Sequence, residues 1–153
     1  MDTNSDIQND TLKVAPFDHA AIQRIAIITD AWFPQINGVV RVLDSVRKEL
    51  VALGHSVQMI TPDAFRTVPC PSYPEIPLAL FPGRKMSKIL NEAQPTAIHI
   101  ATEGPLGLTA RWWCLRRNVP FTTAYHTKFP EYVHVRTHLP LSWLYRVVRW
   151  VHG

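Results

Sequence analysis

Residues 24–54 constrain the fold of this chain more than any other stretch. Residues 24–29 (RIAIIT) form an almost unbroken apolar run that ends in a polar residue, which is typical of a strand covered on both faces of a sheet. From Gly38 onward, apolar residues recur at intervals of three and four, which predicts an amphipathic helix that stops at Gly54. A strand, a loop and a helix in this order begin a parallel α/β sheet.

The alternation of strands and helices continues along the chain. Strands are predicted over residues 56–61, 78–81, 96–101 and 119–125, and helices over residues 85–93 and 104–117. The proline-rich residues 63–77 are predicted to form a loop that crosses the sheet edge, because proline fits neither a helix interior nor a central strand. The whole pattern predicts a doubly wound α/β sheet of about five parallel strands.

The bulk composition fits one domain. A chain of 153 residues, 46% of them hydrophobic, can build a single core. Residues 1–23 are polar and acidic without periodicity, so we expect a disordered leader there and a domain over residues 24–153. No apolar run approaches the roughly 20 residues that a membrane span needs, and the two cysteines lack CxxC spacing. The cysteine usage favours a cytoplasmic protein, and the lack of a span predicts that it is soluble or bound peripherally at the inner face of the membrane.

Basic residues dominate the chain after residue 110. Seven lysines and arginines between Arg111 and Arg149 are opposed by Glu131 alone. An anionic ligand or an anionic lipid surface would match this charge, but a solvated basic face has the same pattern. Residues 140–151 form a basic amphipathic pattern that suits packing against the sheet, which we favour, or peripheral contact with an anionic membrane.

Ligands of doubly wound sheets bind at the carboxyl ends of the strands, so four loops are predicted to share one rim. These loops begin at Asp30, Pro62, Thr102 and His126. Asn37 and Gly38 lie at a helix N-terminus on this rim, where backbone N–H groups attract a phosphate or another anion. Ordinary helix capping by Asn37, with Gly38 as a hinge, explains the same two residues.

Two other rim residues carry groups suited to chemistry. His126 directly follows a predicted strand, where it can bind a sugar hydroxyl or transfer a proton, or simply be satisfied by its neighbours. Glu103 takes the same place one unit earlier, where it can bind a hydroxyl or a cation, or complement the N-terminus of the next helix. The sequence contains no GxGxxG, GxxxxGK[ST], HExxH or GxSxG motif, and we expect no metal site.

Four motifs together resemble the N-terminal half of the GT-B glycosyltransferases of family 4, which are retaining enzymes. The motifs are Asp30-x-Trp-x-Pro-x-x-Asn-Gly-Val39, ELVALGHSV (residues 49–57), HIATEGPLG (residues 99–107) and YHTKFPEY (residues 125–132). The likeness is strongest to GDP-mannose-dependent α-mannosyltransferases and diacylglycerol glycosyltransferases. It implies that residues 24–153 form the Rossmann-like, acceptor-side domain of such an enzyme.

The resemblance also implies roles for individual residues. His126 matches a cleft histidine that contacts the transferred sugar, which makes it the implied catalytic residue. Asn37, Gly38 and Val39 match a glycine-containing loop close to the donor phosphate and the acceptor. The implied acceptor side comprises Glu103, Gly104, Thr127 and Lys128.

The implied reaction moves a hexose, mannose or glucose, from a GDP- or UDP-sugar to a lipid or glycan acceptor. It needs no cofactor, bound metal or nucleic-acid partner, because protein cations and helix dipoles stabilise the leaving diphosphate. GT-B enzymes carry a second, donor-binding domain that is absent from residues 1–153, so we expect this polypeptide to be inactive alone. The alternative is a stand-alone Rossmann-like module that binds an anionic ligand or partner without catalysis. A dehydrogenase is disfavoured because its fingerprint is missing.

Overall fold

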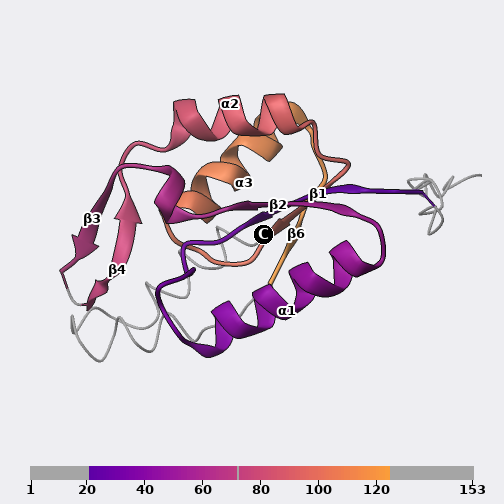
Figure 1. The fold of residues 1–153 in the computed structure, drawn as a ribbon. Coiled ribbons are helices and arrows are strands. Elements are labelled where there is room, and N and C mark those ends of the chain that lie inside the picture. The colour runs from indigo at the N-terminus through magenta and orange to yellow at the C-terminus, as the bar shows by residue number, and fades with distance from the viewer. Residues whose placement is uncertain (1–20, 72, 125–153) are drawn as a thin grey trace, which may run out of the picture.

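A computed structural model of the chain describes residues 21–71 and 73–124, and its centre is a parallel sheet. Four strands form this sheet in the order β2-β1-β5-β6: β1 (Arg24–Ile28), β2 (Ser56–Ile60), β5 (Ala97–Ile100) and β6 (Thr122–Thr123). Helix α1 (Gly38–Ala52) covers one face, and α2 (Gly83–Ala93) and α3 (Pro105–Arg117) cover the other (Figure 1). The predicted α/β class and the doubly wound parallel sheet are confirmed.

Strand β1 explains why residues 24–29 are so uniformly apolar. It pairs in parallel with two neighbours, so that Ile25 lies opposite Val57 of β2 and Ala97 of β5. Ile27 packs on the side of α1, whereas Ile28 packs on the side of α2 and α3, and both side chains are almost completely buried. Full burial of one such side chain stabilises the fold by about 1.5–3 kcal/mol. Both faces of β1 therefore select apolar residues.

The two faces of the sheet carry cores of different size. The larger core lies under α2 and α3 and contains Met86 and Leu90 of α2 with Leu106, Ala110, Trp113 and Cys114 of α3. The smaller core lies under α1 and is built around Ile27, Leu43 and Ala101. The sheet and its helices therefore form three packed layers, with α1 on one side of the sheet and α2 and α3 on the other.

Helix α1 begins and ends as the sequence predicts. The side chain of Asn37 accepts a hydrogen bond from the backbone N–H of Val40 at 3.0 Å, which caps the first turn. The helix itself ends at Ala52, and Gly54 follows with a φ of 90°, a left-handed conformation that favours glycine.

The prediction for residues 63–81 is wrong in two respects. Instead of a loop followed by a sheet strand, the chain forms a hairpin of β3 (Thr67–Cys70) and β4 (Tyr73–Ala79), after a short 3-10 turn, η1 (Pro62–Ala64). This antiparallel pair is a separate sheet at the left of Figure 1, so the described residues contain four parallel strands rather than about five. Prolines are tolerated because both strands are edges, and Pro69 lies opposite Pro77 in the register.

Some predicted features lie outside the described residues. They are most of the leader at residues 1–20, the strand end at residue 125 and the amphipathic segment at residues 140–151. Within the part of the chain that the structure describes, no helix combines the length and the apolar character that crossing a membrane requires.

Candidate functional site

The carboxyl ends of the four parallel strands meet along one edge of the sheet. The N–H of Thr29 donates to the carbonyl of Ile60, and the N–H of Ala101 donates to the carbonyl of Ile28. The N–H of Ala124 likewise reaches the carbonyl of Ile100 at 3.1 Å. These bonds bring together the starts of the loops that follow β1, β2, β5 and β6. The predicted common rim is confirmed up to residue 124.

A buried carboxylate joins two loops of this rim. Asp30 is only 7% exposed, and its Oδ1 accepts a hydrogen bond from the backbone N–H of Leu106 at 2.8 Å. Its Oδ2 accepts from the N–H of Gly107 at 3.2 Å and from the hydroxyl of Thr102 at 2.8 Å. The backbone N–H of Asp30 in turn donates to Thr102 Oγ1 at 2.6 Å. The end of β1 therefore holds the first turn of α3 in place.

Two glycines of the HIATEGPLG motif allow the start of α3 to pack closely against Asp30 and the Thr102 backbone. A Cβ atom added to Gly104 would lie 2.4 Å from Cγ of Asp30, and one added to Gly107 would lie 1.8 Å from the backbone oxygen of Thr102. Neither position has room for a side chain. Gly104 was predicted as an acceptor-side residue, and its contact with Asp30 gives it a structural role that does not depend on a ligand.

Burial and hydrogen bonding have opposite effects on the pKa of Asp30. Burial raises the pKa of Asp30 above its ordinary value of 3.8, while the bonds from Leu106, Thr102 and Gly107 act in the opposite direction. The first turn of α3 contains no acidic residue of its own, so Asp30 is the carboxylate that complements its helix dipole. The sequence analysis considered Glu103 for this role, but the Leu106 and Gly107 N–H groups donate to Asp30 instead.

The sequence places Asp30 at the start of a rim loop and gives it no further role. A charged residue at the end of the apolar run of residues 24–29 is the signal that could have identified it, since a charge close to a buried strand needs nearby partners. The partner itself is not visible in the sequence, because Leu106 lies 76 positions further along the chain.

The turn at Asn37 and Gly38 is an ordinary helix cap with open space in front of it. Asn37 caps α1 through Val40, as the simpler explanation of this turn requires. A Cβ atom added to Gly38, however, would meet nothing within 4 Å. Among residues 21–71 and 73–124, the backbone N–H groups of Gly38 and Val39 find no acceptor, as at many helix starts. Within the described part of the chain, no group competes with an anion for these two donors.

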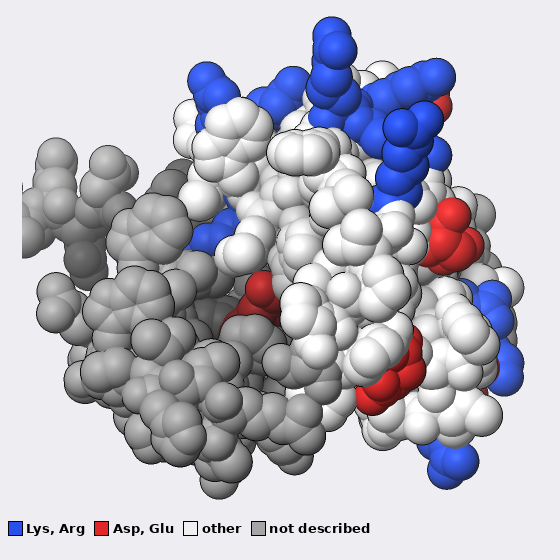
Figure 2. Space-filling view, turned by 90° about the vertical axis from the view of Figure 1, so that its left-hand side faces the viewer, with Lys and Arg blue, Asp and Glu red and all other residues white. Residues whose placement is uncertain are grey.

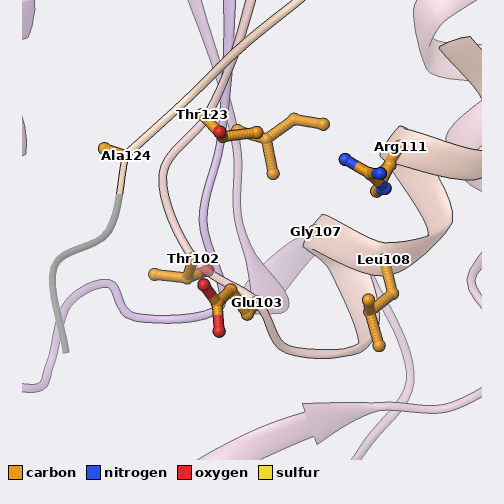
Figure 3. Close-up of a pocket in the computed structure, with 8 residues that line it drawn as sticks. Thr102, Glu103, Gly107, Leu108, Arg111, Thr123 and Ala124 are labelled. Atoms are coloured by element: carbon orange, nitrogen blue, oxygen red, sulfur yellow. The ribbon is translucent and has the colours of Figure 1, made fainter. Parts of the chain in front are cut away.

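A shallow, solvent-open hollow lies at the ends of β5 and β6, beside the first turns of α3 (Figure 3). Glu103 and Thr102 lie at the end of β5 on one side of it, and Arg111 reaches it from α3 on the other side. The guanidinium of Arg111 rests over the ring of Phe121, 5.7 Å from the ring centre. The remaining lining is contributed by Ile100, Gly107, Leu108, Thr123 and Ala124.

The structure thus brings part of the predicted site together. Glu103 and Gly104 sit on the loop that Asp30 fastens to the end of β1, next to the loop that leads to Asn37, Gly38 and Val39. The predicted roles of His126, Thr127 and Lys128 stay predictions, because these residues lie outside the described part of the chain. Within that part, no three histidine, cysteine or acidic side chains are grouped so that they could hold a metal ion.

Comparison with known proteins identifies the family. The family model described as Glycosyltransferase Family 4 matches residues 36–153. The chain is 29% identical over 124 residues to the alpha-monoglucosyldiacylglycerol synthase of Streptococcus pneumoniae. This alignment covers 72% of this chain and 28% of that protein. It is 27% identical over 127 residues to the GDP-mannose-dependent alpha-mannosyltransferase of Mycobacterium tuberculosis, covering 71% of this chain and 33% of that protein.

A second alpha-monoglucosyldiacylglycerol synthase, from Acholeplasma laidlawii, is 29% identical over 126 residues, or 72% of this chain and 31% of that protein. The chain therefore spans about a third of the length of these relatives. No solved structure matches it significantly. The family match covers most of the chain and contains the rim loops from Asn37 to Gly107, and the Rossmann-like sheet agrees with the GT-B resemblance. The chain belongs to Glycosyltransferase Family 4.

Proposed function

We propose that this chain is the acceptor-side half of a retaining glycosyltransferase. In this proposal a hexose, mannose or glucose, passes from a GDP- or UDP-sugar to a lipid or glycan acceptor. The observation that carries the proposal is the family match over residues 36–153. The names of the relatives add support, because two of them are glucosyldiacylglycerol synthases and another is a GDP-mannose-dependent mannosyltransferase.

The two helix starts at the rim favour different partners. The N-terminus of α3 is already bound by the carboxylate of Asp30, so it would repel a second anion. The N-terminus of α1 has open space at Gly38 and available N–H groups at Gly38 and Val39. A diphosphate of the donor would therefore bind at α1, through backbone N–H groups and the helix dipole. This arrangement supports transfer without a bound metal or another cofactor.

The acceptor would lie on the side of α3. Glu103 is partly buried at the end of β5 and could accept hydrogen bonds from acceptor hydroxyls, with Gly104 beside it. By resemblance, His126 would contact the transferred sugar, and Thr127 and Lys128 would complete the acceptor side. The two substrates would then meet between the loops that Asp30 fastens together.

Peripheral contact with an anionic membrane is a further part of this proposal. Trp112 and Leu115 on α3 are 56% and 55% exposed, and the guanidinium of Arg116 lies 4.4 Å from the centre of the Trp112 ring. Figure 2 shows lysines and arginines gathered along the top of the molecule, where α2 lies in Figure 1. Exposed aromatic and basic side chains together suit an anionic lipid surface. Sedimentation with liposomes that does not depend on anionic lipid content would contradict this contact.

A transfer assay tests the main proposal. The full-length gene product is incubated with labelled GDP-mannose or UDP-glucose and with diacylglycerol or glycan acceptors, and the labelled product is measured. We expect transfer by that product and none by a polypeptide of residues 1–153, because the relatives are about three times as long. Turnover by residues 1–153 alone would show that the half-site account is wrong. Absence of transfer with every donor and acceptor would remove the enzyme proposal.

A further inference from the structure

The loops after β1 and β5 leave the sheet in opposite directions. In the strand order β2-β1-β5-β6, the chain first runs from β1 to β2 and later continues on the other side of β1, at β5. The loop after β1 leads to α1 on one face of the sheet, whereas the loop after β5 leads to α3 on the other face (Figure 1). Ligands of doubly wound sheets bind at such a switch point. Contacts across it therefore set the separation of groups carried by the two loops.

A single hydroxyl group connects the two loops at this point. Thr102 Oγ1 accepts a hydrogen bond from the backbone N–H of Asp30 at 2.6 Å and donates one to Asp30 Oδ2 at 2.8 Å. The pair of bonds uses both the donor and the acceptor capacity of a hydroxyl, and a methyl group has neither. Asp30 is buried, so water does not simply replace a bond that is lost there.

The loop of residues 102–107 is held at both ends by the carboxylate of Asp30. Thr102 bonds to it at the start of the loop. The N–H groups of Leu106 and Gly107 bond to it at the end, at 2.8 and 3.2 Å. The proposed acceptor-side residues 103 and 104 lie between these two attachments. The bonds at the end also cap α3, whereas the bonds of Thr102 fix the start of the loop against the end of β1.

We infer that Thr102 is a positioning residue for sugar transfer, and that it acts through Asp30. Its hydroxyl fixes the acceptor side at residues 103–104 relative to the loop that leads to the donor side at residues 37–39. The inference rests on the proposed function and adds a residue that itself binds neither substrate. The rate of a reaction between two bound groups depends on their separation, and a displacement of about 1 Å can cost about a hundredfold. Loss of the hydroxyl should therefore slow transfer and leave the binding of each substrate almost unchanged.

Thr96 forms a matching bridge at the opposite edge of the sheet. Its Oγ1 accepts a hydrogen bond from the backbone N–H of Arg24 at 3.0 Å. Thr96 thus connects the starts of β5 and β1, as Thr102 connects their ends. Removal of either hydroxyl weakens the attachment between the same two strands, but only Thr102 lies beside the proposed site. Thr96 is therefore the control for a general loss of stability.

Three variants of the full-length protein test the inference. Thr102→Val replaces the hydroxyl with a methyl group, Thr102→Ser keeps the hydroxyl, and Thr96→Val removes the hydroxyl at the opposite edge. Initial rates of transfer are measured over a range of donor and acceptor concentrations and corrected for the folded fraction, which circular dichroism gives. We expect Thr102→Val to lower kcat at least about tenfold, with both KM values within about twofold of the wild type. Thr102→Ser and Thr96→Val should keep kcat within about twofold of the wild type.

The order of the loop gives a readout that does not require transfer. NMR relaxation of the full-length protein, isotopically labelled at glycine, reports on the backbone N–H of Gly104. We expect an order parameter of about 0.85, typical of a rigid backbone, in the wild type, Thr102→Ser and Thr96→Val, and a value below about 0.6 in Thr102→Val. A rigid Gly104 in Thr102→Val would overturn the inference, because the hydroxyl would then not hold the loop.

The kinetic outcomes distinguish the inference from the proposed function. A wild-type protein that transfers no sugar with any donor or acceptor would contradict the proposed function, and the positioning role would fall with it. If the wild type transfers sugar, an unchanged kcat in Thr102→Val, or an equal loss in Thr102→Ser or Thr96→Val, would overturn the inference alone. A raised donor or acceptor KM at unchanged kcat would also overturn it, because Thr102 would then act in substrate binding.

Discussion

Asp30 caps helix α3 through Leu106: the carboxylate oxygen lies 2.8 Å from the backbone nitrogen, although 76 positions separate the two residues in the sequence. The same carboxylate bonds to Thr102 and Gly107, so one side chain fastens the ends of β1 and β5 to the start of α3. Any acceptor site on the Thr102–Gly107 loop depends on this cap.

Replacement of the Asp30 carboxylate by an amide should destabilise the fold, because an amide cannot accept all of the hydrogen bonds of the cap. In Asp30→Asn one carboxylate oxygen becomes an NH₂ group, which would face the Gly107 or Leu106 N–H and leave a buried donor without an acceptor. We expect the free energy of unfolding to fall by about 1–3 kcal/mol, measured by urea denaturation. Asp44→Asn is the control, because Asp44 pairs with Arg47 and Lys48 at the solvent-exposed surface of α1 and should change the midpoint little. Equal midpoints for the two variants would contradict the role of the cap.

Asp30 and Asp44 should contribute to the pH dependence of stability with opposite signs. The pKa of Asp30 is raised by burial, so the folded state binds its proton more tightly than the unfolded state. Its contribution is fully present below pH 3.8, the ordinary value, and is lost as the pH rises through the higher folded pKa. The pKa of Asp44 is lowered by hydrogen bonds from Lys48 and Arg47, so its contribution is present above pH 3.8 and is lost as the pH falls through the lower folded pKa.

Carboxyl-carbon NMR titration measures both values directly, and urea denaturation across the same pH range gives the stability. Comparison of the wild type with Asp30→Asn and Asp44→Asn isolates each contribution. Titration of Asp30 below pH 3.8 would show that its hydrogen bonds outweigh its burial, contrary to this prediction.

Glycine-to-alanine changes should separate structural glycines from one that faces open space. An added Cβ clashes with Asp30 at Gly104 and with the Thr102 backbone at Gly107, so each change should cost at least about 1–3 kcal/mol of stability. Gly38→Ala meets nothing within 4 Å and replaces a poor helix former, so its stability should be equal or up to about 1 kcal/mol higher. Thermal denaturation followed by circular dichroism measures all three. Clear destabilisation by Gly38→Ala would mean that its surroundings are not open.

His126→Ala in the full-length protein should lose most sugar transfer while keeping its fold. The expectation rests on the resemblance of the Tyr125-His126 motif to a histidine that contacts the transferred sugar. His55→Ala is a suitable control, because His55 precedes β2 at the opposite edge of the sheet and accepts a hydrogen bond from the N–H of Gln23. Transfer assays and circular dichroism of both variants provide the test. Near-normal turnover in His126→Ala would remove this residue from the mechanism.

The two cysteines should differ sharply in reactivity. Burial raises the pKa of Cys114 to about 11, so almost no thiolate exists at pH 8, and its side chain lies in the core under α3. Cys70 is partly exposed in β3. A colorimetric thiol reagent at pH 8 should modify one thiol quickly in the native protein and the second only after denaturation. Rapid reaction of both native thiols would contradict the packing of α3.

The sequence by itself determined the α/β class of the domain and the positions of its first strand and first helix. The apolar run at residues 24–29, the periodicity of residues 38–53 and the position of Gly54 predict β1, α1 and its end closely, because burial on both faces of a strand and on one face of a helix leaves a local pattern. The rim followed from topology, since parallel strands place their carboxyl ends at one edge. The β3–β4 hairpin was missed, because prolines exclude central strands but not a pair of edge strands.

Only the tertiary structure decided how the rim residues divide their roles. Asp30 and Leu106 meet because β1 and β5 are neighbours in the sheet, and no local pattern links positions 76 apart. The approach of Asp30 explains the glycine at position 104, whereas Gly107 is required by the nearby backbone of Thr102. Because Asp30 binds the start of α3, the start of α1 is the one that has open space for an anion. The hollow between Glu103 and Arg111 has the same origin, since its walls come from β5, β6 and α3. Side-chain periodicity records burial, whereas hydrogen bonds between distant segments are recorded only in the fold.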